Sequence, residues 1–180
     1  MPVFSISTDT IDQTCNSCAK KSKAFSYDVC LESLESVPVS RATNLQGLAL
    51  IAMELALENA TSTISTIIKF LDNETSTFDD DPFGLACMKD CLELYSNGVT
   101  TLLESVGDFL IGKYDEARKK MNSVMDATSM CEDGFMEKKL LIEEGNNMNS
   151  SPLTEENYNL FQLCDIALCI VNLLSLSLDV

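Results

Sequence analysis

The sequence predicts an all-α protein: an up-and-down four-helix bundle preceded by an N-terminal α-hairpin and stapled by disulfides. Apolar residues recur every three or four positions along four long segments, and period-two alternation is almost absent. The chain of 180 residues also holds eight cysteines, an even number. Such a count is typical of disulfide bonds formed in an oxidising compartment, because cytosolic thiols are kept reduced.

Sequence signals at the ends of the four segments support this assignment. The segments are residues 44–71, 82–110, 114–131 and 154–178. Asp81 is expected to cap the second helix, with Pro82 at its first position. Gly112 interrupts the pattern, and such a short connection predicts antiparallel neighbours. Thr154, followed by two glutamates, is expected to cap the last helix.

The N-terminal part is expected to form a tail over residues 1–11 and a single domain over 12–180. Within that domain we expect the α-hairpin at 12–43 and the bundle at 44–180. The hairpin would consist of helices at Asp12–Lys23 and Tyr27–Ser36, stopped by Pro38 and tied together by Cys15 and Cys30. The first twelve residues have neither a basic start nor a continuous apolar stretch, so we expect that a secretory leader was removed or that this is a trimmed form.

Charge and hydropathy limit the partners. A formal net charge of −16 and a pI near 4.1 make nucleic acids and anionic membranes poor partners, and favour a protein or neutral carbohydrate surface. The most apolar segment, Ile166–Leu178, is interrupted by polar residues and too short to cross a membrane. We therefore expect it to be a buried core helix.

The composition also excludes most catalytic chemistry. Because the chain has no histidine, Ser-His-Asp and Cys-His mechanisms and histidine-ligated zinc sites are ruled out. The acidic run at 79–81 lies beside a helix start, where solvated carboxylates are common. We expect no catalytic residue, no metal and no cofactor.

The cysteines leave alternatives open. Cys15 and Cys18 form a C-x-x-C pair that could act as a redox pair or, with Cys87 and Cys91, hold zinc. A redox motif of this kind normally adjoins a βαβ unit, which the pattern lacks. Cys87 and Cys91 lie four apart on one helix, and Cys164 and Cys169 lie five apart, so neither pair has a good geometry for a bridge. The pairing of Cys18, Cys87, Cys164 and Cys169 stays open.

Three triplets match the acceptor for N-glycosylation, which is compatible with secretion. They begin at Asn59, Asn73 and Asn149.

Several short motifs occur in a characteristic order. They are Cys15-x14-Cys30, Asn44-Leu45-Gln46-Gly47-Leu48-Ala49, Asp90-Cys91-Leu92-Glu93-Leu94-Tyr95, Cys131-Glu132-Asp133-Gly134-Phe135 and Leu153-Thr154-Glu155-Glu156-Asn157. Together they resemble the plant invertase and pectin methylesterase inhibitor family over residues 15 to 178. The segment from Cys131 to Lys139 is most similar to a subgroup that includes pollen allergens and is often described as invertase inhibitors.

The resemblance implies a four-helix bundle after an α-hairpin, with disulfides Cys15–Cys30 and Cys91–Cys131. It also implies a protein without chemistry of its own. Such a protein binds a secreted plant carbohydrate-active enzyme one to one and covers its substrate cleft. The implied location is extracellular, in the apoplast or cell wall, with the vacuole as a second compartment.

The target depends on the start of the third long helix. Invertase inhibitors carry Pro-Lys-Phe there, where this chain has Tyr114-Asp115-Glu116, and two carboxylates would be repelled by an acidic sugar site. Gly112-Lys113-Tyr114 loosely matches a segment of pectin methylesterase inhibitors, so that enzyme is the preferred target, with Lys113, Tyr114 and Asp115 as candidate contacts. A purely structural interpretation turns Tyr114 inward and places Asp115 on the helix dipole.

Other functions stay open at this point. The first alternative is an inhibitor of cell-wall or vacuolar invertase. The second is a secreted structural or allergen-like helical protein without a target, and the third is a thiol enzyme built on Cys15 and Cys18.

Overall fold

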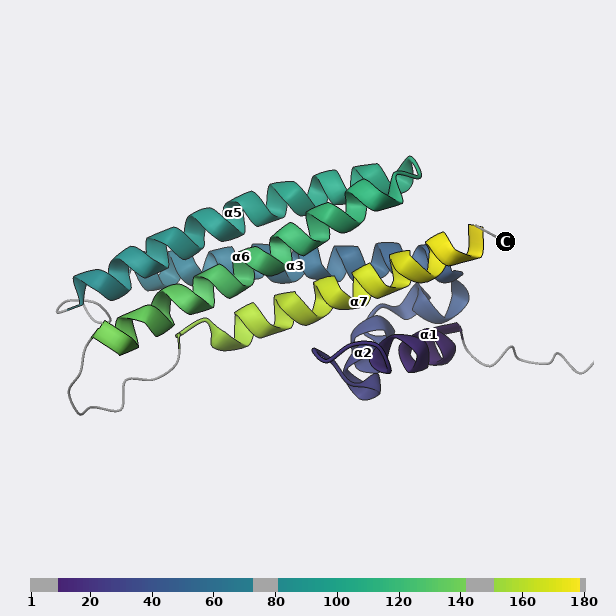
Figure 1. Cartoon of the computed structure of the whole chain (residues 1–180), viewed down its shortest axis with the longest axis horizontal. Coiled ribbons are helices and arrows are strands. Elements are labelled where there is room, and N and C mark those ends of the chain that lie inside the picture. Colours follow the sequence, from purple (N-terminus) through teal and green to yellow (C-terminus); the bar gives the residue numbers. More distant parts are fainter. Residues whose placement is uncertain (1–9, 73–80, 142–150, 179–180) are drawn as a thin grey trace, which may run out of the picture.

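The computed structural model describes residues 10–72, 81–141 and 151–178. These ranges form six α-helices and one 3-10 helix, and contain no strand. The helices are α1 (Thr10–Ala19), α2 (Tyr27–Glu35), η1 (Pro38–Ala42), α3 (Leu45–Asp72), α5 (Pro82–Leu110), α6 (Tyr114–Leu141) and α7 (Thr154–Leu178). The four long helices run side by side and the α1–α2 hairpin lies against one side of them (Figure 1). The predicted all-α architecture is confirmed.

The bundle has a square cross-section. α3 packs against α5 and α7, and α6 packs against the same two helices, so α3 and α6 occupy opposite corners. Two groups of buried side chains fill the interior, one shared with the hairpin and one toward the other end. Fully burying one large apolar side chain contributes about 1.5–3 kcal/mol, so this interior is the main source of stability.

The apolar pattern of α5 was only partly right as a guide to burial. Met88, Tyr95 and Leu102, which follow the apolar spacing of the sequence, are buried. Leu103 and Leu110 follow the same three- and four-residue spacing, yet they are 55% and 59% exposed. The buried face instead continues through Ser105 and Phe109, because a straight helix has 3.6 residues per turn and gradually turns such residues out of the interface.

Local hydrogen bonds explain where the long helices begin. The Asp81 side chain accepts the Gly84 amide at 2.9 Å and Pro82 takes the first helical position, as predicted. In the same way Asn44 Oδ1 accepts the Gly47 amide at 2.9 Å at the start of α3. A Cβ on Gly47 would lie 1.8 Å from the Thr43 hydroxyl, so this capped entry requires glycine.

At the start of α7 the expected cap was wrong. Thr154 is the first helical residue, and its hydroxyl donates to Glu132 at 2.6 Å. The side chain of Ser151 instead accepts the Leu153 amide at 3.1 Å. The Thr154 hydroxyl, which the local sequence predicted to cap the helix, is thus engaged in a tertiary hydrogen bond to α6.

The hairpin helices differ from the expected ranges. α1 begins at Thr10, two residues inside the segment expected to be a tail, because Ile11 is fully buried in the core. It ends at Ala19, four residues before the expected Lys23. The Ser22 hydroxyl accepts the Ala24 amide at 2.9 Å, so the chain turns there instead of continuing the helix.

One face of α7 holds the hairpin on the bundle. Cys15–Cys30 closes the hairpin, and Cys18 is bonded to Cys169 of α7. On the same helix Asp165 accepts the Ser22 hydroxyl at 2.6 Å. The side chains of Gln162 and Tyr158 both donate to the Ala24 carbonyl, at 2.7 and 2.9 Å. The four α7 residues lie three or four positions apart, so they share one helical face.

α7 also contains a long apolar stretch. By length and composition alone Thr154–Ser177 could cross a membrane, and 39% of its most apolar window is buried inside the structure. The core helix of a bundle passes the same test. Ile166, Ile170 and Val171 are fully buried in the bundle, whereas Leu176 is 61% exposed, so the prediction of a buried core helix over Ile166–Leu178 was right only for its first half.

The Cys18–Cys169 bond leads to a first prediction. Replacing both residues by serine opens a loop with a sequence separation of 151, which is expected to lower the free energy of unfolding by roughly 4 to 5 kcal/mol. Urea denaturation of the oxidised proteins measures this. Trypsin should also cut faster in the exposed segment 20–23, and equal cleavage rates together with an unchanged urea midpoint would contradict the prediction.

Candidate target-binding site

The predicted contact residues lie at the turn between α5 and α6. Gly112 has a φ of +78°, which glycine adopts without strain, and it follows Ile111, the C-cap residue of α5. The Lys113 amide donates to the Asp108 carbonyl at 2.8 Å and the Gly112 amide to the Phe109 carbonyl at 3.0 Å. These two bonds form a Schellman motif, which reverses the chain within three residues. The turn therefore projects from one end of the bundle.

The structure places the three candidate contacts differently. Lys113 is exposed at the tip of the turn, and no described carboxylate pairs with it. Tyr114 is half-buried, with its ring centroid 5.2 Å from that of Phe109. Asp115 is exposed but forms an ion pair with Arg118. Only Lys113 is left with a free functional group, and Tyr114 agrees with the alternative that turns it inward.

Ion pairs neutralise the acidic residues around the turn. Asp115 pairs with Arg118 and Glu116 pairs with Lys119 at 2.8 Å, both at i,i+3 spacing. Arg118 also donates to Asn172 and Ser175 of α7, each at 3.0 Å, which anchors the start of α6. Sequence reasoning missed these pairs, although the i,i+3 spacing of opposite charges is a recognisable signal.

A third pair joins α6 to α5. Lys120 lies 2.7 Å from Asp108 and 3.2 Å from Glu104. The hydrogen bond to Asp108 raises the pKa of Lys120, and the hydrogen bond to Glu116 raises the pKa of Lys119. Both ammonium groups therefore stay charged over the physiological pH range, and the pairs persist.

All eight cysteines lie within the described residues. The structure forms Cys15–Cys30 and Cys91–Cys131, the pairs implied by the family resemblance, together with Cys18–Cys169. Cys15 and Cys18 belong to different bonds, so the predicted alternatives of a C-x-x-C redox pair and a four-thiolate zinc site are contradicted. Within the described ranges no group of three or more metal-ligating side chains comes together.

Cys87 and Cys164 are buried free thiols. Burial raises the pKa of Cys164 to about 12, and burial together with the charge of Asp90 raises the pKa of Cys87. The Cys87 thiol donates to the Gly134 carbonyl at 3.4 Å. Neither thiol is therefore available as a thiolate nucleophile.

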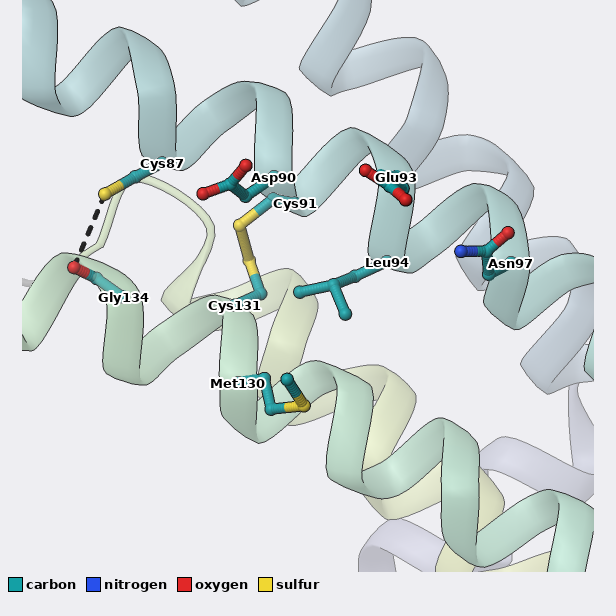
Figure 2. Close-up of a pocket in the computed structure, with 9 residues that line it drawn as sticks. All are labelled: Cys87, Asp90, Cys91, Glu93, Leu94, Asn97, Met130, Cys131 and Gly134. Atoms are coloured by element: carbon teal, nitrogen blue, oxygen red, sulfur yellow. Dashed lines mark hydrogen bonds between the residues drawn. A yellow bond between two sulfur atoms is a disulfide. The ribbon is translucent and has the colours of Figure 1, made fainter.

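A shallow groove runs between α5 and α6 beside the Cys91–Cys131 bond (Figure 2). Its volume is about 330 Å³, and Leu94 and Met130 line it together with the carboxylates of Asp90 and Glu93. The groove contains no pairing of a nucleophile with a base. It is a surface feature rather than a catalytic cleft.

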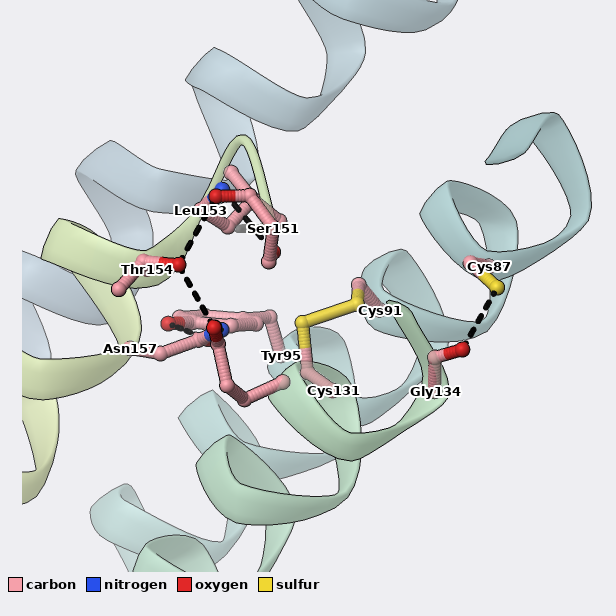
Figure 3. The surroundings of a disulfide bond; sticks show 10 residues. Cys87, Cys91, Tyr95, Cys131, Gly134, Ser151, Leu153, Thr154 and Asn157 are labelled. Carbon is pink, nitrogen blue, oxygen red and sulfur yellow. Dashed lines mark hydrogen bonds between the residues drawn. A yellow bond between two sulfur atoms is a disulfide. The ribbon is translucent and has the colours of Figure 1, made fainter. Parts of the chain in front are cut away.

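On the inner side of the same disulfide, a buried polar cluster joins three helices (Figure 3). The Tyr95 hydroxyl donates to Asn157 Oδ1 at 2.9 Å, and Asn157 Nδ2 donates to Glu132 at 2.8 Å. Burial raises the pKa of Tyr95, so its phenol stays protonated and remains a donor. The cluster fixes the start of α7 against α5 and α6.

The glycosylation candidates fall in two groups. Asn73 and Asn149 lie outside the described residues. Asn59 lies within α3, and its Oδ1 atom is buried. A glycan at Asn59 would require this amide to turn outward.

Fold and site thus define a helical, disulfide-bonded protein with an exposed turn at one end of its bundle. The family model described as "Plant invertase/pectin methylesterase inhibitor" matches residues 9–170. The chain belongs to this family. The family and its named members are inhibitors, so the protein is not an enzyme.

Among the curated relatives, some are named as inhibitors of invertase and one as an inhibitor of pectinesterase. Two proteins named "Putative invertase inhibitor", from Platanus orientalis and Platanus acerifolia, are each 34% identical and cover 95% and 94% of this chain, and 93% and 87% of their own. A "Pectinesterase inhibitor" from Actinidia deliciosa is 30% identical over 84% of this chain and 75% of its own.

Solved structures agree on the fold. A mutant form of a pectin methylesterase inhibitor from Arabidopsis superposes with a TM-score of 0.71 at 22% identity, covering 89% of this chain and 96% of its own. A second inhibitor structure, from Arabidopsis thaliana, gives a TM-score of 0.60 at 22% identity, with 91% and 95% covered.

Gly112 provides a test of the turn. Gly112→Ala should lower the free energy of unfolding by about 1 to 2 kcal/mol, because alanine is strained at this positive φ although its Cβ would meet no atom. The matched control is Gly107→Ala, inside α5 with equally open surroundings, which should stabilise by about 0.5 to 1 kcal/mol. Thermal unfolding of both variants measures the difference, and a stabilising Gly112→Ala would disprove the strain.

Tyr95 provides a test of the buried cluster. Tyr95→Phe should lower the free energy of unfolding by about 1 to 3 kcal/mol, because the buried Asn157 oxygen loses its phenol donor. Tyr158→Phe is the control, since its hydroxyl is on the surface and Gln162 still donates to the same Ala24 carbonyl. Equal urea midpoints for the two variants would mean that the cluster adds no stability.

Proposed function

We propose that this protein is a secreted inhibitor that binds a plant pectin methylesterase one to one and covers its substrate cleft. The observation that supports pectin methylesterase as the target is the arrangement of side chains at the tip of the α5–α6 turn. Lys113 is exposed there, whereas the ring of the following Tyr114 packs on Phe109. The tip thus presents a cation without the exposed aromatic side chain of a Pro-Lys-Phe motif.

The proposed location is extracellular, in the apoplast or cell wall, with the vacuole as a second compartment. Three disulfides support it, because such bonds persist in oxidising compartments. The family supports it as well, since the partners of its members are plant enzymes of cell-wall and sugar metabolism.

Inhibition of acid invertase is the second candidate, and a specific observation favours it. The case against invertase assumed that Asp115 and Glu116 would be repelled by an acidic sugar site. Each carboxylate instead has a cationic partner on its own helix, Arg118 and Lys119. Local pairing weakens that repulsion, and the two Platanus relatives carry the invertase name.

The direct experiment assays purified plant pectin methylesterase and acid invertase side by side at apoplastic pH, with oxidised and with reduced protein. Loss of methylesterase activity with the oxidised protein supports the proposal, and loss of invertase activity alone favours the second candidate. A secreted structural or allergen-like protein would inhibit neither enzyme and would form no tight complex with either.

Lys113 gives this experiment a residue-level test. Lys113→Glu should raise the inhibition constant at least tenfold, because it reverses the one free charge at the tip. The matched control is Lys69→Glu, an equal charge change on an exposed lysine in the last turn of α3, at the opposite end of the bundle. Equal losses for the two variants would attribute the effect to net charge and rule out a contact at the turn.

A further inference from the structure

The outer face of α5 carries large apolar side chains that the fold leaves uncovered. Leu103, Leu110 and Ile111 are 55%, 59% and 68% exposed. Gly107 lies between them, and a Cβ added to it would have no heavy atom of a neighbouring element within 4 Å. These four residues, here called the α5 face, are spaced four, three and one positions apart. They therefore lie on one side of the helix.

No other described element packs on this face. α5 contacts α3 and α6 inside the bundle, while the hairpin packs on α3 and α7. Figure 1 shows α5 along the edge of the bundle away from the hairpin, with the α5–α6 turn at its end. The α5 face therefore continues without interruption into the tip that carries Lys113.

The charge around the α5 face differs from that of the rest of the molecule. Residues 94–120 contain four basic and four acidic side chains, whereas the whole chain has a net charge of −16. The acidic side chains nearest the face, Glu104 and Asp108, are paired with Lys120. This part of the surface is thus electrically neutral, while the excess negative charge lies elsewhere.

We propose that the α5 face is the apolar centre of the interface with the target enzyme, and that it docks on an uncharged, apolar strip next to the acidic group that receives Lys113. The inference rests on the proposed function. Interface centres are depleted in charge and enriched in apolar side chains, and large exposed apolar patches are uncommon on other surfaces. From Leu103 to Leu110 the helix rises about 10 Å, which suits the centre of a standard interface rather than all of it.

The net charge of this chain favours the target enzyme over a second copy of the chain as the partner that binds the α5 face. Two copies would each carry a net charge of −16 outside the contact, and the long-range repulsion between them opposes association. An enzyme surface without excess negative charge meets no such barrier. The free cation of Lys113 at the end of the face would in addition attract an acidic group on the enzyme.

The test compares the wild-type protein with the double variant Leu103→Ser/Leu110→Ser in the two enzyme assays. Because both side chains are exposed, the variant should keep the wild-type melting temperature within a few degrees. Its inhibition constant for the target should rise at least tenfold. The matched control is Val39→Ser/Leu176→Ser, which removes two exposed aliphatic side chains outside α5, 63% and 61% exposed, and should change the inhibition constant less than twofold.

Gly107→Glu is a second variant, which places a charge in the middle of the face without removing any contact. It should weaken inhibition by a similar factor. If the wild-type protein inhibits and both α5 variants inhibit equally well, the α5 face is not the docking surface, although the proposed function stands. If the wild-type protein inhibits neither enzyme, the proposed function itself fails and this inference with it. A wild-type dimer in light scattering that the double variant dissociates would identify a second copy as the occupant and overturn the inference.

Discussion

The tight reversal at Gly112 is the constraint on which the α5–α6 end of this molecule depends. Since the Schellman motif around this residue ends α5 and α6 begins only two residues later, at Tyr114, the two helices lie antiparallel and in contact. The same geometry brings the Tyr114 ring onto Phe109 and leaves Lys113 projecting at the end of the bundle. A longer or more mobile connection would present the lysine without fixing its direction. The turn thus gives Lys113, the proposed contact, a fixed direction.

Disulfides hold the remaining elements to this frame. Cys91–Cys131 joins α5 to α6, and the polar cluster of Tyr95, Asn157 and Glu132 lies beside it and fixes the start of α7. Cys18–Cys169 then joins the hairpin to α7, supported by hydrogen bonds from side chains on the same helical face. The first bond closes a separation of 40 positions and the second a separation of 151. Together they make the relative placement of all the helices less dependent on apolar burial alone.

Charge is distributed unevenly over the molecule. A net charge of −16 keeps it soluble and repels acidic surfaces, yet residues 94–120 are neutral because each acidic group there has a basic counterpart. Local ion pairs, the free lysine and the exposed leucines are found on the same part of the bundle. That coincidence suits a protein whose activity consists in docking on another protein.

The sequence by itself determined the helices, because a period of 3.6 residues and the caps at Asp81 and Gly112 are local properties of the chain. It also excluded histidine-dependent catalysis, and its motifs pointed to the family. It could not decide the pairing of Cys18 with Cys169, since a bond across 151 positions depends on which helices become neighbours. Nor could it distinguish Leu102, which is buried, from Leu103, which is exposed, because both fit a helical stripe within the width of one face. The partner of Thr154, Glu132 on α6, also became known only from the folded chain. Contacts between elements are set by packing and register, and only the tertiary structure contains them.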